Sequence, residues 1–156
     1  MVAYIATGLA AFLFMEFMAW FTHKYVMHGW LWKLHEDHHK PHEHTWELND
    51  VFALIFAVPS IWLIYEGTMH ENMYLLSIGI GILVYGIAYF LVHDVYVHRR
   101  IRLLDRFDNT YLRAVRLAHK MHHKHLERIP GEAYGFLWVP SRYWEMAKQR
   151  KGRKRK

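Results

Sequence analysis

The chain contains no cysteine. Without thiols it cannot form disulfides, and haem-thiolate and cysteine-ligated iron–sulfur centres are excluded. It also lacks a G-x-G-x-x-G sequence and a Walker-type loop, so we expect no nucleotide-binding or flavin-binding domain within it. A redox enzyme of this composition would have to receive its electrons from a separate protein.

Lysine and arginine are missing from two stretches. None of the 20 Lys and Arg residues lies in 1–22 or 51–92, and 53% of the chain is hydrophobic. A hydrocarbon core of about 30 Å needs roughly twenty helical residues. We therefore expect membrane spans near residues 2–22, 51–69 and 73–92. The second is the shortest, because Pro59 interrupts it and it must extend past Glu66, so a buried helix that does not span remains an alternative.

The basic residues gather in 23–50 and 93–156, which predicts that both stretches face the cytoplasm and that the N-terminus lies outside. The N-terminus lacks a basic region typical of a cleavable signal, so the first run is expected to be a retained anchor. The loop 66–72, with His70, would be an external turn. Glu16 lies inside the first span, where a carboxylate is costly. It either supports a metal ligand or, as we favour, makes a structural hydrogen bond to another segment.

Ten of the fourteen histidines form a repeated pattern. An H-x4-H pair is followed by an H-x2-HH triplet, and both motifs then recur in the same order. The ten residues are His23, His28, His35, His38, His39, His93, His98, His119, His122 and His123. Imidazole binds zinc, copper, iron or nickel without adding charge. A tetrahedral site needs only four ligands, so ten imidazoles predict two metal ions in one histidine-rich cage. Four motifs in a doubled order disfavour the alternative of ordinary surface histidines.

Helical geometry groups each triplet. Positions i, i+3 and i+4 share one helix face, so each triplet can direct three rings into a common cavity. The i, i+5 spacing separates the two rings of a pair by about 140° on an ideal helix. We therefore expect the pairs to straddle a site or to sit where a helix ends.

The remaining segments predict supporting elements. Arg99 to Ala118 suits either an interfacial helix that caps the metal site or an amphipathic helix over the domain's own core. Gly79 and Gly81 are expected to aid helix packing. Residues 141–156 form a basic tail, expected to be disordered from Lys148, that would attract anionic lipid headgroups or an acidic electron carrier. Nucleic acid is not an expected partner.

Several phrases around the histidines resemble the β-carotene 3-hydroxylases, a group within the fatty-acid, sterol and carotenoid hydroxylase superfamily. The similar phrases, in order from residue 16, are E-F-M-A-W-F-T-H-K-Y-V-M-H-G-W, L-H-E-D-H-H-K-P-H, N-D-V-F-A-L-I-F-A, V-H-D-V-Y-V-H, A-H-K-M-H-H and Y-G-F-L. The resemblance spans roughly residues 12 to 140. The histidine pattern alone identifies only the superfamily, whereas the phrases around it are narrower.

The resemblance implies an all-α integral membrane bundle of about three spans with a cytoplasmic, histidine-rich dimetal cap. Residues 1–140 would form the membrane hydroxylase domain and 141–156 the tail. Two non-haem iron ions, held by the ten motif histidines, would use O2 to hydroxylate carbon 3 of carotenoid β-ionone rings. Zinc can replace iron in a purified sample, because imidazole cages bind zinc readily. The implied partners are a carotenoid from the bilayer, membrane lipids and an external electron donor such as ferredoxin with its reductase.

Other residues are expected around the metals. Carboxylates next to ligands can orient imidazole N–H groups, which makes Glu36, Asp37 and Asp94 candidates, although each could instead point to water. His42, His44 and His125 lie outside the motifs and are expected to be supporting or solvent-facing. Residues that could line a substrate cavity, or simply pack between helices, are Trp20, Trp62, Tyr89 and Phe90.

Two other functions are compatible with the sequence. The same metal chemistry could hydroxylate or desaturate a fatty acyl or sterol lipid. A membrane metal carrier is the alternative of a different class, but carriers place ligands near the bilayer midplane. Here the ligands follow the spans at one face, which favours a closed site.

Overall fold

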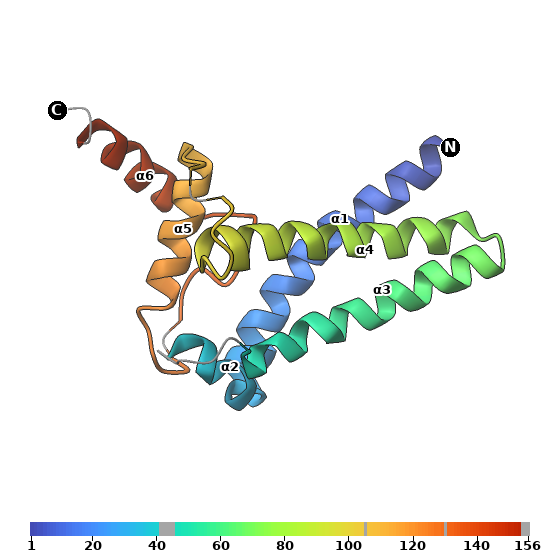
Figure 1. The fold of residues 1–156 in the computed structure, drawn as a ribbon, viewed down its shortest axis with the longest axis horizontal. Coiled ribbons are helices and arrows are strands. Elements are labelled where there is room, and N and C mark those ends of the chain that lie inside the picture. Colours follow the sequence, from blue (N-terminus) through green and yellow to red (C-terminus); the bar gives the residue numbers. More distant parts are fainter. Residues whose placement is uncertain (41–45, 105, 130, 154–156) are drawn as a thin grey trace.

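Three long apolar helices form the body of the protein (Figure 1). The computed structural model describes residues 1–40, 46–104, 106–129 and 131–153. Helices α3 (Val51–Met69) and α4 (Met73–Phe90) form a hairpin, and α1 (Val2–Phe21) crosses α4. All three belong to segments long and apolar enough to cross a membrane. The predicted spans and the all-α fold class are confirmed, and α3 reaches full length despite Pro59.

Glycines allow α4 to approach both of its neighbours. A Cβ on Gly81 would lie 2.3 Å from the carbonyl oxygen of Gly8 in α1, and one on Gly79 would lie 2.8 Å from the Ile64 side chain in α3. The hydroxyl of Ser60 donates to the carbonyl oxygen of Gly79 at 2.8 Å, which links α3 to α4. The expected role of these glycines in helix packing is therefore confirmed, and apolar side chains remain exposed on the outer faces of the three helices.

The two helices that lead to histidine pairs change geometry at their ends. Helix α1 continues as the π-helical segment η1 (Thr22–Trp30), and α4 continues as the π-helical segment η3 (Leu91–Val97). Gly29, with φ −102° and ψ −126°, breaks the first of these and turns the chain into α2 (Trp32–His39). A short 3-10 turn, η2 (Leu48–Asp50), leads into α3.

Helices α2, α5 (Thr110–His122) and α6 (Ser141–Arg153) gather at one end of the bundle (Figure 1). The helix expected over Arg99 to Ala118 begins only at Thr110. The side chain of Asn109 accepts the backbone N–H of Leu112 at 2.8 Å, which is the N-cap geometry that starts a helix. Before it, described residues from 98 onward form bends and turns.

The expected disorder from Lys148 is also corrected, because α6 continues to Arg153. Tyr143 and Ala147 lie on one face of α6 and are buried against the α5 residues Ala114 and Leu117 and against Phe136. Burial of this apolar face stabilises the helix. The division of the chain at residue 140 stays a prediction, although the first turns of α6 pack into the same core as α5.

The close approach of α1 and α4 gives a testable expectation. Replacing Gly81 with valine should lower the free energy of unfolding by about 1–3 kcal/mol, because the new side chain overpacks the interface with Gly8. Thermal unfolding in detergent would measure the loss. Gly86→Ala is the matched control, since nothing lies within 4 Å of a Cβ there, and it should not destabilise. Equal stability of the two variants would contradict the packing role.

Candidate metal centre

The π-helical turns bring the two rings of each H-x4-H pair together. The backbone N–H of His98 donates to the carbonyl oxygen of His93 at 2.9 Å, an i→i+5 bond that stacks residues five apart. The ring centroids of His93 and His98 are 4.5 Å apart, and those of His23 and His28 are 5.2 Å apart. The expectation that each pair straddles a site is therefore wrong, because it assumed ideal α-helical turns. The alternative, that the pairs sit where a helix ends, is confirmed.

Nine of the ten motif histidines form two groups, within each of which the candidate ligand nitrogens lie within 4.8 Å of one another. Cluster A consists of His23, His28, His35, His39 and His122, and cluster B of His38, His93, His98 and His119. The tenth, His123, lies between them. Its ring stacks on His39 at 4.5 Å and approaches His119 at 4.4 Å.

Each triplet is divided between the clusters rather than directed into one cavity as expected. In the first triplet, the i, i+4 residues His35 and His39 belong to cluster A, whereas His38 belongs to cluster B. In the second triplet, His119 belongs to cluster B and His122 to cluster A. The first half of the histidine pattern therefore supplies His38 to cluster B, and the second half supplies His122 to cluster A. These two rings link α2 to α5 through the site.

In cluster A, every ring is oriented by a hydrogen bond from Nδ1. The acceptors are the carbonyl oxygens of Tyr134 for His23 (3.0 Å), Arg128 for His28 (3.0 Å), His125 for His39 (2.9 Å) and Glu132 for His122 (2.8 Å), and the side-chain oxygen of Asn49 for His35 (2.7 Å). A carbonyl oxygen can only accept, so Nδ1 carries the proton and Nε2 of a neutral ring keeps a free lone pair. This is the usual orientation of a metal-ligating histidine.

The free lone pairs face one another. Nε2 of His28 lies 3.2 Å from Nε2 of His122, and Nε2 of His35 lies 3.1 Å from Nε2 of His39. Within the described part of the chain, the buried Nε2 atoms of His38 and His123 have no hydrogen-bond partner. Unprotonated nitrogens at these separations repel each other unless a cation lies among them. The donor set therefore fits bound metal ions.

Burial keeps these imidazoles neutral at pH 7. It lowers the pKa of His39 to about 4 and the pKa values of His98 and His122 to about 3. Burial also lowers the pKa of His35, to about 2, and neighbouring imidazoles lower all four further. Neutral rings can bind a metal ion without first losing a proton.

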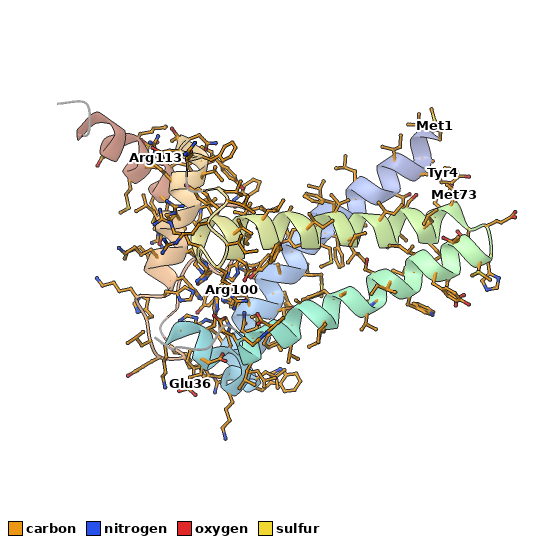
Figure 2. The ribbon with its side chains drawn as sticks, viewed as in Figure 1. Met1, Tyr4, Glu36, Met73, Arg100 and Arg113 are labelled. Atoms are coloured by element: carbon orange, nitrogen blue, oxygen red, sulfur yellow. The ribbon has the colours of Figure 1, made fainter. Side chains whose placement is uncertain are left out.

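The three predicted supporting carboxylates have different positions. Asp94 accepts from Nδ1 of His93 at 3.2 Å, as expected. Asp37 instead accepts the backbone N–H of Leu48 at 2.6 Å, and Glu36 pairs with Lys40. Figure 2 shows Glu36 at the outer edge of α2, whereas Arg100 lies among the side chains between α2 and α5.

The remaining histidines lie outside both clusters or outside the described residues. His125 contributes its backbone carbonyl, and its ring lies 3.8 Å from the Glu132 carboxylate. His70 is a loop residue with a side chain 71% exposed, as expected. His42 and His44 lie outside the described residues.

Sequence reasoning missed two supporting side chains. Glu47 accepts from Nδ1 of His38 at 2.5 Å, and Asn49 accepts from His35. Both residues lie between the first histidine triplet and the second span. This closeness in sequence was the only indication that they could support the ligands. Four backbone carbonyls that orient cluster A could not be found from residue types.

Glu16 fastens the segment that orients cluster A. Its carboxylate accepts the backbone N–H groups of Phe136 (2.9 Å), Leu137 (3.1 Å) and Trp138 (2.9 Å) and the hydroxyl of Tyr85 (2.8 Å). This confirms the favoured structural hydrogen bond. It also holds the chain next to Tyr134, whose carbonyl oxygen orients His23.

Comparison with known proteins identifies the family. A profile of the fatty acid hydroxylase family matches residues 8–145. The chain belongs to the fatty acid hydroxylase family. In this chain the two histidine clusters lie near one end of the three candidate spans. The family profile covers all of the segments that carry them. No solved structure is significantly similar to the chain.

Curated relatives of this hydroxylase-family chain come from bacteria and plants. Beta-carotene hydroxylase of Pseudescherichia vulneris is 42% identical over 142 residues, which cover 89% of this chain and 80% of that protein. Beta-carotene hydroxylase of Pantoea ananas is 43% identical over 129 residues, covering 81% and 71%. Beta-carotene hydroxylase 2, chloroplastic, of Capsicum annuum is 42% identical over 144 residues, covering 90% and 46%. The chain therefore spans about half the length of the plant relatives.

The Glu16 contacts can be tested directly. Glu16→Ala should lower the free energy of unfolding by about 3 kcal/mol or more, because three backbone N–H groups lose a charged acceptor. Thermal unfolding in detergent and protease sensitivity of segment 131–140 would report it. Glu66→Ala is the control, since Glu66 pairs only with the exposed His70 among the described contacts. A Glu16 variant as stable as this control would contradict the anchoring role.

Proposed function

We propose that the chain hydroxylates carbon 3 of carotenoid β-ionone rings with O2, converting β-carotene through β-cryptoxanthin to zeaxanthin. The observation that carries the proposal is the 42% identity to a bacterial beta-carotene hydroxylase over 80% of that protein's length. Relatives from Arabidopsis thaliana and Gentiana lutea bear the name beta-carotene 3-hydroxylase, which supports the ring position. The paired histidine clusters support the chemistry.

The residues that would hold two iron ions are those of clusters A and B together with His123. The nine cluster rings present candidate ligand nitrogens at close range, and the ring of His123 lies between the clusters. When bound, two iron ions would supply the electrons and O2 activation needed to hydroxylate an unactivated C–H bond. Clusters that share rings from both triplets would keep the two ions close together in one fixed arrangement.

Aromatic side chains cover cluster B on the side of the spans. The ring of Tyr89 stacks on His93 at 4.9 Å, and Phe136 lies 4.5 Å from Tyr89 and 5.3 Å from His93. These rings exclude water from the ligands on that side. They also provide an apolar surface against which a hydrocarbon ring can be positioned. Tyr89 was among the residues expected to line a substrate cavity.

A groove of about 470 Å³ lies between α1 and the segment anchored by Glu16. Its lining includes Leu13, Phe17, Trp20, Tyr134 and Trp138. Leu13, Phe17 and Trp138 are more than half exposed, so the groove is open on its apolar side. The ring of Tyr134 lies 5.1 Å from that of His28, so the groove adjoins cluster A. A lipid-soluble carotenoid would approach here from the bilayer, and Trp20 is again one of the expected lining residues.

The charge distribution supports a sidedness and a set of partners for the proposed enzyme. With the N-terminus outside, the positive-inside rule places both clusters and the basic residues of α6 at the cytoplasmic face. An acidic electron carrier of the ferredoxin type, reduced by its reductase, would supply electrons there. Anionic lipid headgroups would contact the same basic surface.

The second candidate is hydroxylation or desaturation of a fatty acyl or sterol lipid, of which the family description supports the hydroxylation of a fatty acid. A metal carrier is less well supported, because the clusters lie together near one end of the bundle instead of along a path between the spans.

Pigment analysis separates these functions. The chain would be expressed in cells that accumulate β-carotene, beside His38→Ala for cluster B, His122→Ala for cluster A and His70→Ala as the matched control in an exposed loop. Chromatography should show β-cryptoxanthin and zeaxanthin with the wild type and the control, and at least about a 100-fold loss in both cluster variants, since each removes a ligand.

Unchanged β-carotene with wild-type protein present in the membrane and donors supplied would contradict carotenoid hydroxylation. An altered membrane lipid under those conditions would support the second candidate. Metal transport into vesicles without oxygen-dependent product would support the carrier.

A further inference from the structure

The two clusters differ in the charge of the groups that orient their rings. All five Nδ1 partners in cluster A are neutral: four backbone carbonyls and the amide oxygen of Asn49. In cluster B, the Nδ1 atoms of His38 and His93 face the carboxylates of Glu47 and Asp94. A carboxylate that accepts the Nδ1 proton makes the imidazole a more basic metal ligand. A neutral carbonyl oxygen in the same position has a smaller effect.

Arg100 joins the carboxylates next to cluster B. Its guanidinium lies 2.6 Å from Glu47, 2.9 Å from Asp50 and 3.3 Å from Asp94. Glu47 and Asp50 lie at the two ends of η2, directly before α3, whereas Asp94 belongs to η3, so Arg100 links the two ligand-bearing halves. The planar guanidinium can bind several carboxylates at fixed angles, which an ammonium group cannot.

The backbone also fixes Arg100. Its N–H donates to the carbonyl oxygen of Asp94 at 2.9 Å, and the preceding Arg99 has a φ of 59°. A left-handed conformation is unfavourable for a non-glycine residue and persists only where the surroundings impose it. The turn directs the Arg100 side chain back toward the carboxylates instead of outward.

The described charged side chains beside cluster A do not bind its Nδ1 atoms. The Arg128 guanidinium donates to the carbonyl oxygen of His28 at 2.8 Å. The Glu132 carboxylate points away from the cluster and accepts from the Tyr143 hydroxyl at 2.9 Å, while only its backbone carbonyl faces His122. Around Arg100, three carboxylates face one guanidinium, and on another side of cluster B the cations Arg99, Arg116 and Lys120 line a cavity with His98 and His119.

We propose that the two metal sites are electrostatically unequal, and that Glu47, Asp94 and Arg100 are positioning residues that make cluster B the tighter site. The two carboxylates increase the basicity of His38 and His93, and Arg100 holds both carboxylates in place. Cluster B therefore binds a divalent cation first and favours the more highly charged state of a redox-active ion. This inference rests on the metal centre of the proposed function.

Titration of purified, metal-free full-length protein with Co²⁺ tests the proposal, with visible absorption and calorimetry as readouts. The wild type should bind two equivalents with different affinities. Glu47→Gln should weaken the tighter equivalent by about 10–100-fold and leave the other nearly unchanged. Asn49→Asp is the reciprocal variant: it gives His35 an anionic partner and should strengthen the weaker equivalent.

Arg100 is tested in the same titration. Arg100→Gln should weaken the tighter equivalent, and Arg100→Lys should restore it only partly. Arg113→Gln is the matched control, since Arg113 pairs with Asp108 and Thr110 at a distance from the clusters, and it should leave both affinities unchanged. If Glu47→Gln fails to give a monodisperse, helical protein, Asp94→Asn tests the second carboxylate of the same cluster.

The outcomes are distinguishable. Two equal affinities in the wild type, or equal weakening of both equivalents by Glu47→Gln, would overturn the inequality and leave a dimetal hydroxylase intact. A wild-type protein that binds no Co²⁺ would contradict the proposed function itself.

Discussion

The hydrogen bonds made by histidine Nδ1 atoms are the constraint on which the rest of the site depends. Each fixes a tautomer and a ring direction, so Nε2 lone pairs converge from η1, α2, η3 and α5 on two small volumes. Most acceptors are backbone carbonyls of segment 125–134. Glu16 holds the residues that follow this segment, through the backbone N–H groups of Phe136, Leu137 and Trp138. The half-buried Glu16 carboxylate of the first candidate span therefore influences ring directions at the candidate metal centre.

The arrangement of the histidine pairs also requires the π-helical turns of η1 and η3. Residues five apart diverge on an α-helix but stack on a π-helix, so a histidine pair at this spacing can serve one metal only where the helix widens. The chain places both turns directly after apolar helices that are packed closely through glycine. The closely packed helices α1 and α4 thus end where the π-helical segments that carry the histidine pairs begin.

Much of this was predictable from sequence, and the failures have physical causes. Long apolar runs without Lys or Arg defined the three spans, because bilayer thickness leaves few alternatives. The ten histidines were recognisable as candidate ligands from their doubled spacing, and nine of them lie in the two clusters. The pairing of rings was mispredicted because the π-turns depart from ideal helix geometry, and the triplets were divided because His38 and His122 point to the opposite cluster. Carbonyl acceptors carry no residue signature, and α6 is helical because it packs against α5, which composition does not reveal.

The most direct test of the central claim is the iron content and iron-edge X-ray absorption of anaerobically purified, iron-reconstituted protein. Two iron ions per chain, each in a shell dominated by imidazole nitrogen with a second iron as a near scatterer, are the expected result. A single iron per chain, or a shell dominated by oxygen, would contradict two histidine clusters that act as one dimetal centre.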